Sequence, residues 1–379
     1  MNILMISGDK SILDEQSEAH ERMRAYAGVC DELHIVVLTN QDSTVRVYGN
    51  LFLYHACGRG KIIQRMRAMS MARMATKRHM IDIVSAQSPD EMGCIAFVIS
   101  RLFRIPLQLQ VHTDMLSPWY RRAGIMPRIR YYLARFLLPR AQCIRVVSRR
   151  IRDSLADTLG ISSSLMTVLP IFTNVQKFTV PHSGGIDNAK LRSAQFKIIA
   201  VGRFLDREKN FSMLIRAMTG VIKMCPSAIL MLVGDGPDKE YYVSLIHLYG
   251  LENHIIVEPW RTDLDMLYPS FDVFALPSYI EGWGRAVIEA MASGLAVVMT
   301  DVGLAGEVVH EGINGYVVPV ADSAKFTVRL IDLWQNPEKR QAFGRMAKET
   351  AVHLEPRTEG EYLIQWRKSF TCCFLRQIV

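Results

Sequence analysis

The sequence predicts an α/β protein made of two doubly wound, parallel-sheet domains. Short apolar runs alternate with longer helical stretches in both halves of the chain. A polar, irregular stretch at residues 170–194 separates the two halves. The chain has 379 residues, which is long for one hydrophobic core and comfortable for two.

The apolar runs are short and continuous, as is typical of parallel strands that are covered on both faces. In the first half, strands are expected at Ile3–Ile6, Leu33–Leu38, Asp82–Ala86, Leu107–Val111, Cys143–Val147 and Met166–Leu169, with helices at residues 17–27, 61–79, 91–103, 124–138 and 149–158. In the second half, strands are expected at Lys197–Val201, Ala228–Val233, Ile255–Val257, Val273–Leu276, Ala296–Met299 and Gly315–Val318, with helices at residues 210–224, 237–248, 284–293, 322–335 and 338–353.

These elements set the expected domain boundaries. The first domain is expected at residues 1–175, a linker at 176–194, the second domain at 195–358, and a helical tail at 359–379, whose return to the first domain is one option. Two doubly wound domains joined by a linker place a cleft between them, at the carboxyl ends of both sheets. A ligand site is therefore expected at those strand ends.

Composition is that of an ordinary globular protein, with 49% hydrophobic and 22% charged residues. No apolar run reaches the roughly 18 residues that span a bilayer, and the start of the chain lacks the basic lead of a signal peptide. Seven scattered cysteines without a C-x-x-C pair predict reduced thiols and no zinc site. The predicted location is the cytoplasm.

Positive charge is concentrated in the first half. Residues 1–190 hold 25 Lys and Arg against 15 Asp and Glu, a balance of +10, whereas residues 191–379 hold 20 against 22, a balance of −2. Arg59–Arg78 and Arg121–Arg152 carry 7 and 10 basic residues and no acidic ones. Such segments suit an anionic membrane surface, here the inner face of the membrane, and solvated helix faces are the alternative. No recognition-helix, zinc-finger or RNP pattern points to nucleic acid.

The most informative stretch brackets a tight loop and the start of a helix with two glutamates. A helix N-terminus offers unpaired N–H groups and a partial positive charge, which can receive a phosphate. Carboxylates accept hydrogen bonds and therefore suit the hydroxyls of a sugar and a ribose. The stretch predicts a nucleotide-sugar site and reads Glu281-Gly282-Trp283-Gly284-Arg285-Ala286-Val287-Ile288-Glu289.

Other loops of the second half also end strands. Gly202 allows a sharp turn, and the Arg203 and Lys209 cations at the two ends of the next loop can clamp a diphosphate or simply be solvated. Trp260 and Arg261 can lie against a nucleobase, with packing of the Trp260 ring as the alternative. The turn Gly234-Asp235-Gly236 is more simply a strand-to-helix connection.

In the first half, two residues at strand ends are candidates. His112 follows an expected strand and can hydrogen-bond a sugar or acceptor hydroxyl, or fill a structural role. Gly8 can admit a ligand phosphate or only make a turn. No metal site or cofactor is expected, because the histidines show no paired spacing and Asp263-Leu264-Asp265 is interpreted as a helix cap.

Taken together, these motifs resemble those of a GT-B-fold glycosyltransferase of the retaining family 4. The ordered matches span about residues 195–325 and comprise Gly202-Arg203 with Lys209-Asn210, Leu232-Val233-Gly234-Asp235-Gly236-Pro237, Pro277-Ser278 through Glu281-Gly282-Trp283-Gly284 to Glu289-Ala290-Met291-Ala292-Ser293-Gly294, and Gly312-Ile313-Asn314-Gly315. Looser matches in the first half are Asp82–Pro89 and Val146–Ser148. The chain departs from the family pattern with a lone Gly8, with Asp301–Ala305, which lacks a second glycine, and with Ile171–Asn174 in place of an Asn-Gly turn.

The resemblance implies transfer of a sugar from a nucleotide-diphosphate donor to a hydroxyl acceptor, with retention at the anomeric carbon and without a metal. A lipid-linked acceptor, as in polysaccharide or glycolipid assembly, is one option. Arg203 and Lys209 would stabilise charge on the leaving phosphate, Glu289 would bind the ribose and Glu281 the donor sugar. Backbone N–H groups of Gly282, Trp283 and Gly284 would hold the sugar or phosphate, and His112 would contact the sugar. Alternatives are a sugar-nucleotide 2-epimerase of the same fold and a non-catalytic nucleotide-sugar binder.

Overall fold

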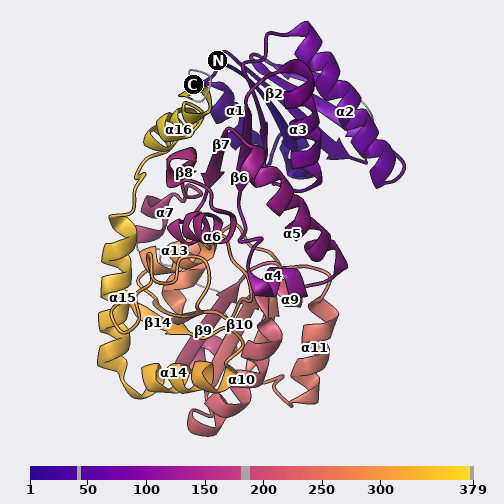
Figure 1. The fold of residues 1–379 in the computed structure, drawn as a ribbon. Coiled ribbons are helices and arrows are strands. Elements are labelled where there is room, and N and C mark those ends of the chain that lie inside the picture. The colour runs from indigo at the N-terminus through magenta and orange to yellow at the C-terminus, as the bar shows by residue number, and fades with distance from the viewer. Residues whose placement is uncertain (41–43, 181–187, 376–379) are drawn as a thin grey trace. The chain divides into compact units, whose positions relative to one another are not determined.

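The computed structural model describes residues 1–40, 44–180 and 188–375 and divides into two compact units. The first unit comprises Met1–Pro170 and Glu359–Val379, and the second comprises Ile171–Thr358. The centre of the expected linker, residues 181–187, lies outside the described residues. Each unit is a parallel α/β sheet with helices packed on it, which confirms the predicted fold class (Figure 1).

The first unit is built on an eight-stranded sheet in the order β3-β4-β2-β1-β5-β6-β7-β8, with only β3 and β4 antiparallel. Its strands are β1 (Asn2–Ser7), β2 (Glu32–Thr39), β3 (Val45–Tyr48), β4 (Leu51–Cys57), β5 (Ile83–Ala86), β6 (Leu107–Val111), β7 (Cys143–Val146) and β8 (Met166–Val168). Neither strand of the β3–β4 hairpin was expected from the sequence. Alternation in β3 and the Gly49-Asn50 turn are nevertheless hairpin signals.

Right-handed crossovers place α2, α3, α5 and α6 on one face of this sheet and α1 on the other. Helix α3 contacts both α2 and α5, so these three helices lie side by side (Figure 1). The helices of this unit are α1 (Glu18–Ala27), α2 (Lys61–Arg78), α3 (Glu91–Phe103), α4 (Pro118–Arg122), α5 (Ile125–Leu137), α6 (Arg149–Leu159), α16 (Glu359–Lys368) and α17 (Cys372–Leu375), with short 3₁₀ turns at Lys10–Leu13, Leu138–Arg140 and Ser163–Leu165.

The C-terminal helices α16 and α17 cover the face of the first sheet that the crossovers leave open. Tyr26 of α1 stacks on Trp366 of α16 with 4.1 Å between ring centroids. Gln108 of β6 donates from Nε2 to the backbone oxygen of Ser369 at 3.0 Å. Cys143 of β7 forms a disulfide with Cys373 of α17. The expectation of reduced thiols is wrong at this pair, because the returning tail brings together cysteines that are 230 residues apart.

The second unit is built on a parallel six-stranded sheet in the order β11-β10-β9-β12-β13-β14, which is the order of a doubly wound nucleotide-binding sheet. Its strands are β9 (Phe196–Val201), β10 (Ala228–Val233), β11 (Ile255–Glu258), β12 (Val273–Leu276), β13 (Ala296–Thr300) and β14 (Gly315–Val318). Its helices are α7 (Val175–Thr179), α8 (Ala189–Ser193), α9 (Asp206–Lys209), α10 (Phe211–Met224), α11 (Lys239–Leu248), α12 (Leu264–Leu267), α13 (Arg285–Ala292), α14 (Ser323–Gln335) and α15 (Pro337–Val352), with a 3₁₀ turn at Tyr268–Ser270.

Packing in the second unit divides between two faces of its sheet. Helix α10 contacts α11 and α14, whereas α13 contacts α7 and α15. The aromatic rings of Phe204, Phe211 and Tyr242 meet edge to face inside the first of these layers. Among the described helices, none combines the length and the apolar character that crossing a membrane requires.

Candidate donor site in the second unit

The candidate residues of the second unit follow neighbouring strands of its sheet. Arg203 follows β9, Trp260 follows β11, and Glu281 follows β12. Because all six strands run in parallel, these loops share the carboxyl edge of the sheet. The edge therefore gathers cations and carboxylates from segments that are far apart in the sequence.

Lys209 and Glu281 form a direct ion pair at this edge. The Lys209 Nζ atom lies 2.5 Å from Glu281 Oε1, and both side chains are largely shielded from solvent. The same carboxylate oxygen accepts a hydrogen bond from Ser278 Oγ at 2.9 Å. The predicted phosphate cation and the predicted sugar acceptor are thus bound to each other, and each is held in place by the other.

Asn210 fastens the loop after β9 to the loop after β12. Its backbone has φ +52°, in the left-handed region, and its buried Nδ2 donates to the carbonyl oxygen of Pro277 at 3.1 Å. The N–H of Tyr279 also donates to the carbonyl oxygen of Glu208 at 2.8 Å. These bonds fix Lys209 relative to the Glu281 loop. The sequence analysis gave Asn210 no separate role.

Gly234 and Gly236 allow the loops after β9 and β10 to pack backbone to backbone. A Cβ atom on Gly234 would lie 2.0 Å from the carbonyl oxygen of Gly202, and one on Gly236 would lie 2.4 Å from that of Phe204. The N–H of Phe204 donates to the Asp235 carbonyl oxygen at 2.8 Å. The structure therefore favours the simpler interpretation of this Gly-x-Gly turn, as a strand-to-helix connection.

Glu289 is a buried carboxylate on α13. Its Oε1 lies 3.5 Å from Nη2 of Arg285, one turn earlier on the helix. Burial, and then the charge of Glu289, raise the pKa of the Tyr268 hydroxyl well above its usual value, so Tyr268 stays protonated near this carboxylate. Glu289 thus offers carboxylate oxygens in a shielded position.

The segment between the two glutamates brings backbone groups to the start of α13. Gly284 has φ +106° and occupies the N-cap position, and no side chain caps the helix there. Trp283 is buried, so its ring is not open to a ligand. Its carbonyl oxygen would lie 2.7 Å from a Cβ atom on Gly303, which shows how tightly Gly282–Gly284 packs against the loop after β13.

Trp260 is exposed to solvent, whereas Arg261 is held by a neighbouring carboxylate. The Trp260 side chain is 59% exposed, which argues against the packing alternative. Arg261 binds the carboxylate of Asp263 through Nε at 2.9 Å and Nη2 at 2.5 Å. Asp263 occupies the N-cap position of α12, as the helix-cap interpretation expected. Its side chain makes no capping hydrogen bond to that helix, so this part of the interpretation is wrong.

Arg203 is exposed at the edge of the sheet. In the part of the chain that the structure describes, no carboxylate pairs with its guanidinium, in contrast to Lys209 and Arg261. Arg203 can therefore bind an anion without first releasing a partner. This makes it the most accessible cation of the candidate site.

His112 follows β6 in the first unit. Burial, and then the charges of Arg145 and Arg22, lower the pKa of His112 to about 3, so the ring is neutral at ordinary pH. Nε2 lies 3.1 Å from Oε1 of Gln110, and because that oxygen can only accept, Nε2 carries the proton. Nδ1 is left as a hydrogen-bond acceptor, which suits a ligand hydroxyl.

Gln110 and Arg145 support His112, and the sequence analysis missed both. Arg145 is 2% exposed and donates from Nη1 to Gln110 Oε1 at 3.1 Å and from Nη2 to Tyr362 Oη at 2.8 Å. Glutamines that alternate along the buried strand β6 were the available signal, since a polar residue inside a core needs a partner. These bonds link the His112 loop to the C-terminal helix α16.

Gly8 follows β1 in the first unit and is exposed. A Cβ atom there would lie 3.2 Å from Cε of Met92, the flexible end of a side chain. The protein's own packing therefore does not demand glycine at this position.

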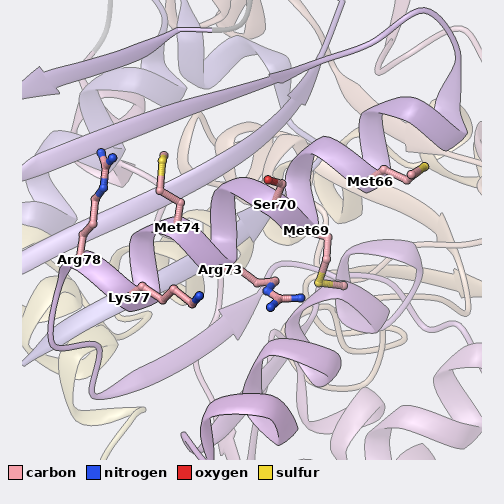
Figure 2. A pocket seen from close by; sticks show the side chains of 7 residues that line it. All are labelled: Met66, Met69, Ser70, Arg73, Met74, Lys77 and Arg78. Carbon is pink, nitrogen blue, oxygen red and sulfur yellow. The ribbon is translucent and has the colours of Figure 1, made fainter.

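The first basic segment forms helix α2, whereas the second runs from the end of α4 through α5 and strand β7, where Arg145 is buried, to the start of α6. Arg65 of α2 and Arg130 of α5 both bind Glu91 of α3, at 2.9 and 3.0 Å. Four exposed apolar side chains of α5 are spaced by four, three and four residues and form a stripe, made of Ile125, Ile129, Tyr132 and Phe136, with the exposed Met126 beside it in the chain. Figure 2 shows a groove along α2 that is lined by methionines and basic residues, Met66, Met69, Ser70, Arg73, Met74, Lys77 and Arg78.

Two family models match this chain. The model for glycosyl transferases group 1 matches residues 186–350, and the model for glycosyltransferase family 4 matches residues 22–177. Together they cover most of both units.

Curated relatives are similar over part or most of the chain. The sulfoquinovosyl transferase SQD2 of Arabidopsis thaliana is 28% identical over 71% of this chain and 52% of its own length. A Bacillus subtilis protein named "Putative glycosyltransferase EpsD" is 30% identical over 41% of this chain and 42% of its own length. An Escherichia coli UDP-Gal:alpha-D-GlcNAc-diphosphoundecaprenol alpha-1,3-galactosyltransferase is 23% identical over 76% of this chain and 75% of its own. The chain thus matches about half the length of the first two relatives.

Solved structures share the fold. Anabaena HepE in complex with UDP superposes with a TM-score of 0.72 at 17% identity, covering 98% of this chain and 100% of that one. Sucrose-phosphate synthase from Thermosynechococcus elongatus superposes with a TM-score of 0.79 at 17% identity, covering 100% and 98%. This likeness shows the GT-B fold, with two parallel-sheet α/β domains.

Proposed function

We propose that this chain, which belongs to the glycosyl transferases group 1 family, transfers a sugar from a nucleotide-diphosphate donor to a hydroxyl acceptor. One observation carries the proposal. One edge of the second sheet gathers an accessible cation, Arg203, and a shielded cation–acid pair, Lys209 with Glu281, and the helix that follows this loop, α13, carries a buried acid, Glu289. Diphosphate and sugar hydroxyls are the complementary chemical groups.

Arg203 and Lys209 would stabilise the leaving diphosphate. When the bond between the sugar and the β-phosphate breaks, negative charge develops on the phosphate oxygens, and fixed cations lower the energy of that transition state. Lys209 would turn from Glu281 toward the phosphate, or share its three N–H donors between both. The start of α13, which no side chain caps, adds N–H donors with a partial positive charge that would also attract the phosphate. We propose that this charge stabilisation takes the place of a metal.

Glu281 and Glu289 would accept hydrogen bonds from hydroxyl groups of the donor. Glu289, buried near Tyr268, would bind the ribose, and Glu281 would orient the transferred sugar. Backbone groups of Gly282–Gly284 would hold the sugar or the phosphate, and the exposed Trp260 ring, with Arg261 beside it, would lie against the base. We propose retention at the anomeric carbon, in which the leaving phosphate takes the proton of the attacking hydroxyl.

His112 would accept a hydrogen bond from a hydroxyl of the sugar or of the acceptor. Its neutral ring and its acceptor atom Nδ1 support that role. Gly8 would border the acceptor or a phosphate. Lipid-linked acceptors are supported by the name of the Escherichia coli relative, a galactosyltransferase acting on a diphosphoundecaprenol-linked sugar.

We also propose that the first unit rests on an anionic membrane from the cytoplasmic side. The exposed apolar stripe of α5 and the methionine-lined groove of α2 offer contact with acyl chains, and the flanking Arg and Lys side chains offer contact with anionic head groups. A lipid-linked acceptor would be presented at that surface.

Thermal-shift screening against UDP-, GDP- and ADP-sugars, followed by an assay of nucleotide release, tests the proposed function. We expect one class of donor to stabilise the protein and to be consumed only when an acceptor is present. Conversion of the donor without acceptor would point to an epimerase, and binding without turnover to a non-catalytic binder.

Two substitutions test the assigned residues in the same assay. Arg203→Ala should lower turnover by roughly tenfold or more, and Glu289→Gln should weaken donor binding. Arg207→Ala, which removes an exposed arginine of the neighbouring helix α9, is the matched control and should leave both unchanged. Full activity in Arg203→Ala and Glu289→Gln would remove the site assignment.

A further inference from the structure

A cluster of two histidines and one glutamate lies in the first unit, on residues that the proposed function does not use. Glu32 and His34 belong to the start of β2, and His79 caps the end of α2. Glu32 Oε2 lies 3.0 Å from His34 Nε2 and 3.1 Å from His79 Nδ1. All three potential ligand atoms lie within 4.8 Å of one another. We call this group the Glu32–His34–His79 cluster.

We propose that the Glu32–His34–His79 cluster binds a divalent transition-metal ion, with Zn²⁺ as the best match. Zinc is commonly bound by His nitrogen and Glu oxygen at about 2.0–2.2 Å, so ligand atoms around a tetrahedral ion lie roughly 3.3 Å apart. The observed separations to Glu32 are close to that value. Three protein ligands leave one position of a tetrahedron for water.

Neighbouring aromatic residues hold His34 in the orientation that a metal ligand needs. The phenolic Oη of Tyr54 on β4 lies 3.0 Å from His34 Nδ1, so the second ring nitrogen has its own partner. Phe52, also on β4, stacks on the His34 ring at 4.5 Å between centroids and 15° between planes. A histidine whose far nitrogen is hydrogen-bonded and whose ring is packed is typical of a supported metal site.

Access to the cluster is one-sided. The side chain of His34 is fully buried, whereas those of His79 and Glu32 are 24% and 33% exposed. An ion can therefore enter from solvent past His79 and Glu32 and meet His34 at the inner end. The cations Lys77 and Arg78, which precede His79 in α2, weaken the attraction for an ion, so we expect moderate affinity.

The cluster is separate from the candidate glycosyltransferase residues. Glu32 begins β2, so it marks the amino edge of the parallel strands, whereas Gly8 and His112 of the same unit follow the carboxyl ends of β1 and β6. A metal here would join the end of α2 to the start of β2 and would thereby anchor the helix that carries the basic groove. It would take no part in sugar transfer.

No metal site was expected from the sequence, and the separation of these residues along the chain explains why. Glu32 and His79 are 47 residues apart, and a strand, a hairpin and a long helix separate them. No short spacing motif links them, so only the folded chain brings them together.

Titration of the metal-stripped full-length protein with ZnCl₂, followed by calorimetry, tests the proposal. We expect one saturable site per chain and a metal-dependent rise in Tm, because an ion that binds only the folded state stabilises it. Glu32→Gln and His79→Ala should each weaken binding at least about tenfold, and Tyr54→Phe should weaken it about tenfold through the support of His34. Co²⁺ in place of Zn²⁺ should give the absorption bands of a four-coordinate site with nitrogen and oxygen ligands.

His247→Ala provides the matched control. His247 Nδ1 lies 2.9 Å from Glu252 Oε1 in an exposed histidine–glutamate pair of the second unit, without a third ligand among the described residues. This variant should bind zinc as the wild type does. The proposal is overturned if wild-type protein shows no saturable binding, or if binding survives Glu32→Gln and His79→Ala. It is also overturned if binding is lost only in Cys372→Ser, which would place the ion at the free thiol of Cys372. Glycosyltransferase activity plays no part in this test.

Discussion

The Lys209–Glu281 ion pair is the central residue-level feature of the candidate site. Each partner neutralises the other at 2.5 Å, in a position largely shielded from solvent. A donor diphosphate would compete for Lys209 and release the Glu281 carboxylate toward the sugar. The pair would thus couple phosphate binding to sugar binding, which a solvated lysine and glutamate could not do.

Glu281→Gln tests this coupling. The amide keeps an acceptor for Ser278 but removes the charge that holds Lys209. We expect the matching nucleoside diphosphate to bind as tightly as before or more tightly, and turnover of the sugar donor to fall by about tenfold or more. Calorimetry with the nucleotide and a nucleotide-release assay measure the two effects. Equal losses for nucleotide and sugar nucleotide would contradict the assigned role, and Glu240→Gln on the surface of α11 is the control.

His112 gives a prediction about pH. Its folded-state pKa of about 3 lies below the usual 6.5, so the ring stays neutral between pH 5 and 8 and its protonation cannot limit the rate there. The pH–rate profile of the wild type should show no limb near 6.5 that disappears in His112→Asn. A limb of that kind would show that the ring titrates normally and would contradict the buried, neutral tautomer.

The lowered pKa of His112 also makes folding stability depend on pH. Because the unfolded chain binds a proton on His112 below about pH 6.5 and the folded chain does not until about pH 3, folding stability falls as the pH drops through that window. His112→Asn should therefore show a weaker loss of stability over the window than the wild type, in chemical denaturation at several pH values.

At the residue scale, the sequence predicted chemistry better than contacts. The residue types at Arg203, Lys209, Glu281 and Glu289 indicated phosphate and hydroxyl binding, which stays a prediction. The structure places the first three after strands of one sheet and Glu289 on α13. The contact of Lys209 with Glu281 and the link that Asn210 makes between two loops could not be predicted from the sequence, because these contacts connect segments that are far apart in the chain.

Elements of the second unit depend on close approach between loops. Gly234→Ala should destabilise the protein by about 3 kcal/mol or more, because a Cβ atom would lie 2.0 Å from a backbone oxygen that cannot rotate away. Gly250→Ala is the matched control, since Gly250 also has positive φ, at +63°, but nothing lies within 4 Å of its Cβ position. It should cost about 1 kcal/mol. Urea denaturation measures both, and equal costs would contradict the packing role.

Helix α5 gives a prediction about membranes. Replacing Tyr132 and Phe136 of its exposed apolar stripe by Ser should weaken binding to anionic vesicles about tenfold, since each substitution removes apolar area from the contact. Cosedimentation at low and high salt is the measurement. Val328→Ser, which removes an exposed apolar side chain of α14 in the second unit, should have no effect. Wild-type protein that ignores anionic vesicles at all salt concentrations would end the membrane proposal.

Most helices and strands could be predicted because their apolar patterns are local. The β3–β4 hairpin was missed although its alternation and its Gly49-Asn50 turn are local signals, because it interrupts the alternation of strands and helices. Basic segments could be located from the sequence, but whether their apolar residues face the core was open. In α5 both occur, since Tyr131, Ala134 and Leu137 are buried while Ile129, Tyr132 and Phe136 are exposed.

On the scale of the whole molecule, the C-terminal tail completes the first unit. Crossovers of one hand leave part of one sheet face open, and α16 and α17 cover it with stacking, hydrogen bonds and the Cys143–Cys373 disulfide. The sequence left the return of this tail as an option, and only polar residues such as Gln108 and Gln110 on a buried strand hinted at a partner. The disulfide could not be predicted, because seven cysteines without a C-x-x-C pair allow many pairings.

Trp366→Ala tests the role of the tail. The ring is fully buried against Tyr26, so its removal should cost about 3–5 kcal/mol of unfolding free energy. Ile364→Ala, on the exposed side of the same helix, should cost about 0.5 kcal/mol or less. Chemical denaturation separates the two. Similar small losses would mean that α16 contributes little to the stability of the first unit.

The account as a whole depends on where the nucleotide sugar binds. A crystal structure of the protein with a bound, unreacted nucleotide sugar tests this most directly. We expect diphosphate oxygens within hydrogen-bonding distance of Arg203 and Lys209, with ribose and sugar hydroxyls on Glu289 and Glu281. A ligand bound away from these four side chains would contradict the proposed function.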